Sequence, residues 1–184
     1  MIASRLRRLA APLALILAAL PAAAEDGPLI AAAADLRFAL PEIAAGFAAE
    51  SGPRLRLTFG SSGNFRRQIE QGAPFELFMS ADEAYALALA ASGHAIDAGV
   101  LYAEGRIVLF APTRSALAVD SGLAGLAEAL RGGRVGRFAI ANPEHAPYGR
   151  RAAEALKRAG LWEAMRPKLV FGENVSQAAQ YATS

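Results

Sequence analysis

Two adjacent serines at the turn between a strand and a helix are the residues of this chain best placed to bind a ligand. Ser61 and Ser62 stand in the turn Gly-Ser-Ser-Gly-Asn, after the alternating strand 54–59 and before a helix that carries Phe65 and Ile69 on one face. The first backbone N–H groups of such a helix have no partner within it, and the helix dipole makes this end positive. With the two hydroxyls, these donors predict a pocket for the oxygens of an anion.

The same strand-to-turn-to-helix junction recurs along the chain. It is found at 34–35, 60–64, 142–149 and 172–175. In an open parallel sheet all such junctions lie at the carboxyl edge of the strands. We therefore expect two junctions in each of two lobes, facing one another across a cleft.

The elements that must position these junctions alternate between strands and helices. The apolar run 75–79 is typical of a strand buried on both faces of a parallel sheet, and 105–112 is predicted as the strand that leads into the second lobe. Asp35 is expected to cap the helix that follows it, and Pro41 to kink or restart that helix near Leu40. The expected lobes are residues 25–104 and 105–184, with the second one incomplete.

The first 24 residues have the pattern of a secretory signal peptide. A start that contains Arg5, Arg7 and Arg8 is followed by the apolar run 9–20 and by an Ala-x-Ala cleavage site that ends at Ala24. The apolar core is too short for a membrane span, and ordinary secretion is expected rather than the twin-arginine route. The three arginines account for the net charge of +2, so the mature chain is slightly acidic and nucleic-acid binding is not expected.

The composition excludes several kinds of chemistry. The chain has no cysteine and only two histidines, His94 and His145, which are not in a metal-ligand spacing. We expect no thiol nucleophile, no directly bound metal and no cofactor. An exported chain without disulfides depends on a packed core, which its 54% hydrophobic content provides.

Four segments carry a resemblance to a known family. AAAADLRFAL, FGSSGNFRRQIEQGAPFELFMSAD, ANPEHAPYG and GENVSQAA, in this order, resemble the periplasmic molybdate-binding proteins of ABC transporters. The resemblance covers residues 29–184 and implies an α/β, two-lobed periplasmic binding protein fold of type II. It also implies a monomer that captures molybdate or tungstate in the periplasm and delivers it to an inner-membrane permease.

The family holds its oxyanion by backbone N–H groups and hydroxyls rather than by cations, which suits a dianion that can only accept hydrogen bonds. The implied ligand-binding residues are Ala34, Asp35, Ser61, Ser62, Pro147, Tyr148 with its phenol, and Val175 through its backbone N–H.

The chain departs from the family pattern in two places. Many members have serine where this chain has Asp35, so we expect the Asp35 side chain to turn aside and cap its own helix. The sequence stops at Ser184 inside an expected helix, and we expect a truncated chain.

Three other functions compete with this reading. A carrier of another oxyanion such as sulfate stays open, because cavity size is not visible in the sequence. An enzyme would use Ser62 as nucleophile and His145 as base, but the turn is not the Gly-x-Ser-x-Gly elbow. The leader argues against a third alternative, a cytoplasmic ligand-sensing domain.

Overall fold

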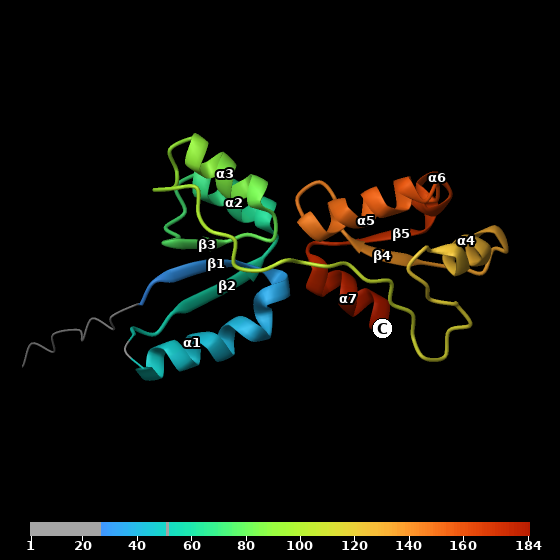
Figure 1. Cartoon of the computed structure of the whole chain (residues 1–184), viewed down its shortest axis with the longest axis horizontal. Helices are drawn as coiled ribbons and strands as arrows, with labels where there is room; N and C mark the ends of the chain where they lie inside the picture. Colours follow the sequence, from blue (N-terminus) through green and yellow to red (C-terminus); the bar gives the residue numbers. More distant parts are fainter. Residues whose placement is uncertain (1–26, 51) are drawn as a thin grey trace, which may run out of the picture.

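Two parallel sheets lie side by side, each with helices on its faces (Figure 1). The computed structural model describes residues 27–50 and 52–184. The predicted signal peptide, 1–24, lies outside the described residues. In Figure 1 the β1–α3 part, which we call the first lobe, is blue to green, and the α4–α7 part, the second lobe, is orange to red.

The first lobe is built on a three-stranded sheet of order β2-β1-β3. The central strand β1, Leu29–Ala33, pairs in parallel with β2, Arg56–Gly60, and with β3, Leu77–Met79. β1 can be central because its alanines are small, and Ala31 and Ala32 are fully buried. The expectation that 75–79 is buried on both faces is wrong, because β3 is a short edge strand on which Leu77 is half exposed.

The helices of the first lobe cover both faces of this sheet. α1, Ala39–Glu50, lies on one face, and α2, Ser62–Glu70, and α3, Glu83–Ala91, lie on the other (Figure 1). The 3-10 turn η1, Ala34–Arg37, precedes α1, so the predicted restart near Pro41 is confirmed. Asp82 caps α3, because its side chain accepts a hydrogen bond from the Ala84 N–H.

The second lobe repeats the strand-to-helix pattern on a two-stranded sheet. β4, Phe138–Ala141, and β5, Leu169–Gly172, pair in parallel. The helices of this lobe are α4, Ala124–Arg131, α5, Pro147–Arg158, α6, Trp162–Met165, the 3-10 turn η2, Arg166–Lys168, and α7, Val175–Thr183. Leu126, Leu156 and Met165 form the centre of its core.

Helix α5 begins at Pro147, inside the segment 142–149 that was predicted as a junction. Proline suits the first turn of a helix because it lacks the N–H that would have no partner there. Gly149 lets α5 lie close to β4, since a Cβ at this position would come 2.0 Å from the carbonyl oxygen of Ala141.

The segment 92–123 joins the lobes and contains neither helix nor strand (Figure 1, yellow). The prediction of a strand at 105–112 is wrong: these residues are in no strand, and Val108 is 86% exposed. A strand needs a neighbour to pair with, and no strand of the described residues lies against this segment. Within 27–50 and 52–184, no helix has the length and apolarity to span a membrane.

Candidate functional site

A small pocket lies where the two lobes meet, and all seven predicted site residues line it. Its walls come from the carboxyl ends of β1 and β2, from the loops before α3, α5 and α7, and from the starts of α2, α5 and α7. No lysine or arginine is among the described residues that line it, which are Ala33, Ala34, Asp35, Gly60, Ser61, Ser62, Ala81, Ala146, Pro147, Tyr148, Asn174 and Val175.

Ser62, the first residue of α2, is the polar side chain most enclosed by the fold, with 1% of its surface exposed. Its hydroxyl oxygen accepts a hydrogen bond from the Ala81 N–H at 3.0 Å. This bond uses a lone pair of the hydroxyl oxygen and leaves the O–H proton of Ser62 available for donation into the pocket.

Ser61 uses its hydroxyl differently, in a contact between the lobes. It donates to the backbone carbonyl of His145 at 2.5 Å and lies 3.0 Å from His145 Nδ1. The Gly63 N–H donates to the same carbonyl at 2.9 Å. His145 Nε2 in turn lies 3.5 Å from a carboxylate oxygen of Glu173, on the loop before α7. His145 is therefore part of a lobe-to-lobe contact, and it approaches Ser61 rather than Ser62, the predicted nucleophile of the enzyme alternative.

Asp35 faces the pocket, which corrects the expectation that its side chain turns aside as a helix cap. No side-chain cap bond forms at the start of η1. One carboxylate oxygen, Oδ2, instead accepts a hydrogen bond from the Tyr148 hydroxyl at 3.0 Å across the lobe boundary. A phenol donor on the facing lobe thus takes the place of the backbone N–H groups that a capping aspartate binds.

Backbone donors complete the pocket. Asn174 caps α7 by accepting from the Gln177 N–H, and so places Val175 at the first position of that helix. Pro147 has no N–H, so the donors of its turn begin at Tyr148. The first N–H groups of α5 and α7 have no partner within their helices and remain available at this edge.

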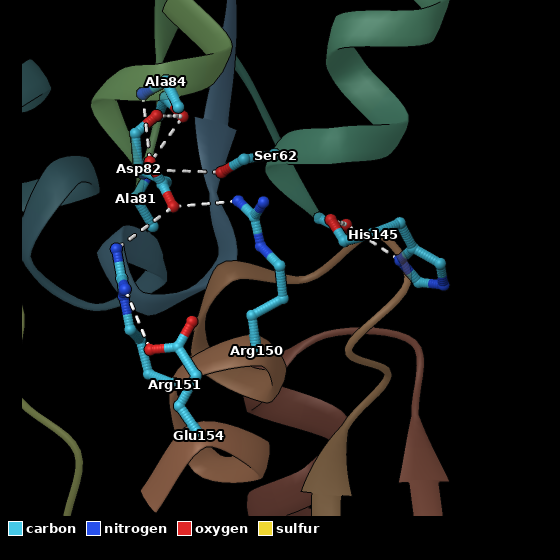
Figure 2. A network of polar contacts seen from close by, with 10 residues as sticks. Ser62, Ala81, Asp82, Ala84, His145, Arg150, Arg151 and Glu154 are labelled. Atoms are coloured by element: carbon cyan, nitrogen blue, oxygen red, sulfur yellow. Dashed lines mark hydrogen bonds and ion pairs between the residues drawn. The ribbon is translucent and has the colours of Figure 1, made fainter.

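An ion pair at the pocket's edge was not predicted from the sequence. Figure 2 shows Arg150 and Arg151 extending from α5 toward Asp82, at the start of α3. Arg150 lies 2.8 Å from Asp82 Oδ2 and Arg151 3.6 Å from it, and Asp82 is only 10% exposed. Arg150 also lies over the Tyr85 ring at 4.7 Å. These arginines hold the lobes together instead of lining the pocket.

The pocket residues that the sequence analysis missed are small or act through the backbone: Ala33, Gly60, Ala81, Ala146 and Asn174. The alanines carry no chemical signal of their own. Gly60, Ala146 and Asn174 lie inside predicted junctions and Ala33 directly precedes one, so the junctions would have indicated these four, whereas Ala81 lies outside all of them. In the part of the chain that the structure describes, no cluster of His, Cys, Asp and Glu could hold a metal ion.

Asp35 perturbs two tyrosines that flank it. Burial, then the charge of Asp35 and its hydrogen bond, raise the pKa of Tyr148 to about 12. Burial, then the charge of Asp35, raise the pKa of Tyr102 to about 12 as well, and the Tyr102 hydroxyl donates to the Ser80 carbonyl at 2.8 Å. Both phenols therefore keep their protons, and remain donors, well above neutral pH.

We predict that two of the four tyrosines ionise only near pH 12 in an ultraviolet absorbance titration of the folded protein. An Asp35→Asn variant should lower the pKa of both, but not to the ordinary value, because burial is the larger cause. Asp97→Asn, which changes an exposed carboxylate bonded to the Gly99 N–H, is the matched control and should leave the curve unchanged. An Asp35→Asn curve that coincides with the wild-type curve would contradict the assignment.

Comparison with known proteins gives a consistent result. The family model for bacterial extracellular solute-binding proteins matches residues 28–184. The chain is 41% identical to the molybdate-binding protein ModA of Rhodobacter capsulatus, over 97% of this chain and 69% of that protein. It is 37% identical to ModA of Escherichia coli, over 85% of this chain and 62% of that one. The chain thus spans about two thirds of the length of these relatives.

A solved structure is similar as well. The periplasmic molybdate-binding protein of Azotobacter vinelandii superposes with a TM-score of 0.65 and 25% identity. The match covers 84% of this chain and 66% of that protein.

Proposed function

The chain belongs to the bacterial extracellular solute-binding protein family, and we propose that it captures molybdate or tungstate and delivers it to the permease of an ABC transporter. Two predictions are confirmed by this membership. The fold is the two-lobed α/β fold of type II periplasmic binding proteins, and the family consists of binding proteins rather than enzymes. The family places its members in the periplasm or outside the cell.

The observation that carries the proposal is the chemistry of the pocket. Four strand-to-helix junctions, two from each lobe, converge on it, and none of its described lining residues is a cation. Hydroxyl and backbone donors without a counter-charge suit a small dianion whose oxygens all accept hydrogen bonds. We assign the ligand contacts to Ser62 and to the N–H groups at Ala34-Asp35, Tyr148 and Val175. The single phenol proton of Tyr148 is donated to Asp35 Oδ2, so this side chain shapes the wall. Ser61 and Pro147 shape the walls, since the Ser61 hydroxyl donates to His145.

The names of the relatives favour molybdate over other oxyanions. Both ModA relatives are named as molybdate-binding proteins, and so is the similar solved structure. Sulfate carries the same charge and remains the competing ligand, and it differs mainly in its smaller size.

The chain has a predicted signal peptide, a predicted lobe boundary and a predicted oligomeric state. We propose a signal peptide cleaved near Ala24, a boundary between the lobes near residue 104, and a monomer that binds no nucleic acid. Mass spectrometry of the exported protein tests the cleavage site, and its mass in solution tests the monomer.

Calorimetric titration of the mature protein with molybdate, tungstate, sulfate and phosphate tests the ligand. We expect micromolar or tighter binding of molybdate and tungstate, which corresponds to about 8 kcal/mol or more, and much weaker binding of the other two. Phosphate, like sulfate, is smaller than molybdate, so both serve as negative controls for the size of the pocket. Equal affinity for sulfate and molybdate would contradict the specificity, and heat from none of the four would contradict the function.

A further inference from the structure

Asp35 is the feature of the pocket that the proposed function does not explain. Its Oδ2 atom accepts from the Tyr148 hydroxyl at 3.0 Å. Its Oδ1 atom is buried and, among the described residues, has no hydrogen-bond partner. The residue lines the pocket, so its carboxylate brings an acceptor to a site whose proposed ligand contacts are all donors.

No described cation compensates the charge of this carboxylate. The 3-10 turn that holds Asp35 packs against β1, β2, α1 and α7. β1 and α7 contain no charged residue. The charged residue of β2, Arg56, stands at the far end of its strand and donates from Nε to the Gly27 carbonyl.

The other elements offer only phenols or distant charges. Arg37, on the turn itself, and the acids of α1, Glu42 and Glu50, are exposed. α5 presents Tyr148, and the connecting segment presents Tyr102. The arginines of α5 that approach this region, Arg150 and Arg151, bind Asp82 instead.

A dianion in this pocket would face an oxygen that can only repel it unless a proton lies between them. The proton can sit on Asp35 and be donated to the oxyanion, or sit on the oxyanion and be donated to Asp35. Both descriptions add one proton from solvent and give the complex the same total charge. We propose that oxyanion binding takes up one proton, held between Asp35 Oδ1 and an oxygen of the bound oxyanion. This inference rests on the proposed function.

Uptake of one proton determines how the affinity for the oxyanion changes with pH. The complex holds one proton more than the separated carboxylate and dianion, so a lower pH favours the complex. Where both free partners are fully ionised, the affinity should rise by about tenfold for each unit that the pH falls. A site built only of neutral donors would show no such slope.

The test is calorimetric titration of the mature protein with sodium molybdate at several values between about pH 6 and pH 8. Each titration is run in two buffers with different heats of ionisation, which gives the number of protons taken up. We expect close to one proton for the wild-type protein and close to none for Asp35→Asn and Asp35→Ser. Both variants replace the charged acceptor with a group that donates a hydrogen bond by itself.

His145→Gln is the matched control, because His145 is a buried imidazole close to the pocket and can bind a proton. Proton uptake should persist in this variant. Molybdate binding by the wild-type protein without proton uptake would overturn this inference and leave the proposed function intact. Uptake that persists in both Asp35 variants, or vanishes in His145→Gln, would assign the proton elsewhere and also overturn it. Absence of molybdate binding at every pH would instead contradict the proposed function.

Discussion

A Gly63→Ala variant is expected to bind molybdate about 10- to 100-fold more weakly than the wild-type protein while keeping its fold. Gly63 lies in the first turn of α2, at the contact between the lobes. A Cβ there would stand 2.5 Å from the carbonyl oxygen of His145 and 2.9 Å from the Tyr85 hydroxyl. Backbone cannot yield as a flexible side chain does, so the added methyl group would push the second lobe away and open the pocket.

Gly46→Ala is the matched control for this prediction. Gly46 lies within α1, and a Cβ there meets nothing within 4 Å. This variant should bind molybdate with unchanged affinity and raise the free energy of unfolding by about 0.5–1 kcal/mol through helix propensity. Titration calorimetry measures the binding of both variants and thermal melts follow their folding. If Gly63→Ala bound as tightly as Gly46→Ala, the contact between Gly63 and His145 would have no part in binding.

The location of the pocket could be predicted because it follows from topology. Each strand of a parallel sheet ends at the same edge, and the helix that follows presents its free N–H groups there. The pattern of apolar runs and turns was enough to identify four such ends. The junctions that hold Ala34 and Val175, far apart in the chain, were therefore expected to face one cleft, and the structure brings these residues together.

Contacts between the lobes could not be predicted in this way. Asp82 and Arg150 lie 68 residues apart, and each has a common local role, as a helix cap and as a residue of a helix surface. Only the packing of α3 against the start of α5 makes them partners. Ser61 and His145 show the same limit, since their bond joins two turns of separate sheets.

The wrong predictions of a strand at 105–112 and of a helix cap at Asp35 have a common physical cause. The apolar run within 105–112 favours a strand, but a strand is stable only beside a partner, and local sequence does not report one. Asp35 stands where aspartate commonly caps a helix, but the Tyr148 phenol of the other lobe binds its carboxylate instead. The strand failed to form because no distant segment pairs with it, and the cap failed to form because a distant side chain binds the carboxylate.

A Ser62→Ala variant is expected to weaken molybdate binding by about 1–3 kcal/mol, or roughly 5- to 150-fold. The Ser62 hydroxyl is almost fully buried and accepts from the Ala81 N–H, which leaves its proton for the ligand. Alanine removes this donor, and because the position is almost fully buried, a water molecule cannot easily take its place. Calorimetric titration gives the change in affinity.

The same substitution also leaves the Ala81 N–H without its acceptor, so it should lower the stability of the ligand-free protein by about 1 kcal/mol. Melts with and without molybdate separate the two effects, because a lost ligand contact reduces only the stabilisation that molybdate adds. Ser92→Ala removes a hydroxyl that donates to the Ala88 carbonyl at the end of α3, and it should leave binding unchanged. If Ser62→Ala lost stability but kept the full stabilisation by molybdate, Ser62 would be a structural residue, and the backbone N–H groups of the four junctions would have to hold the oxyanion without it.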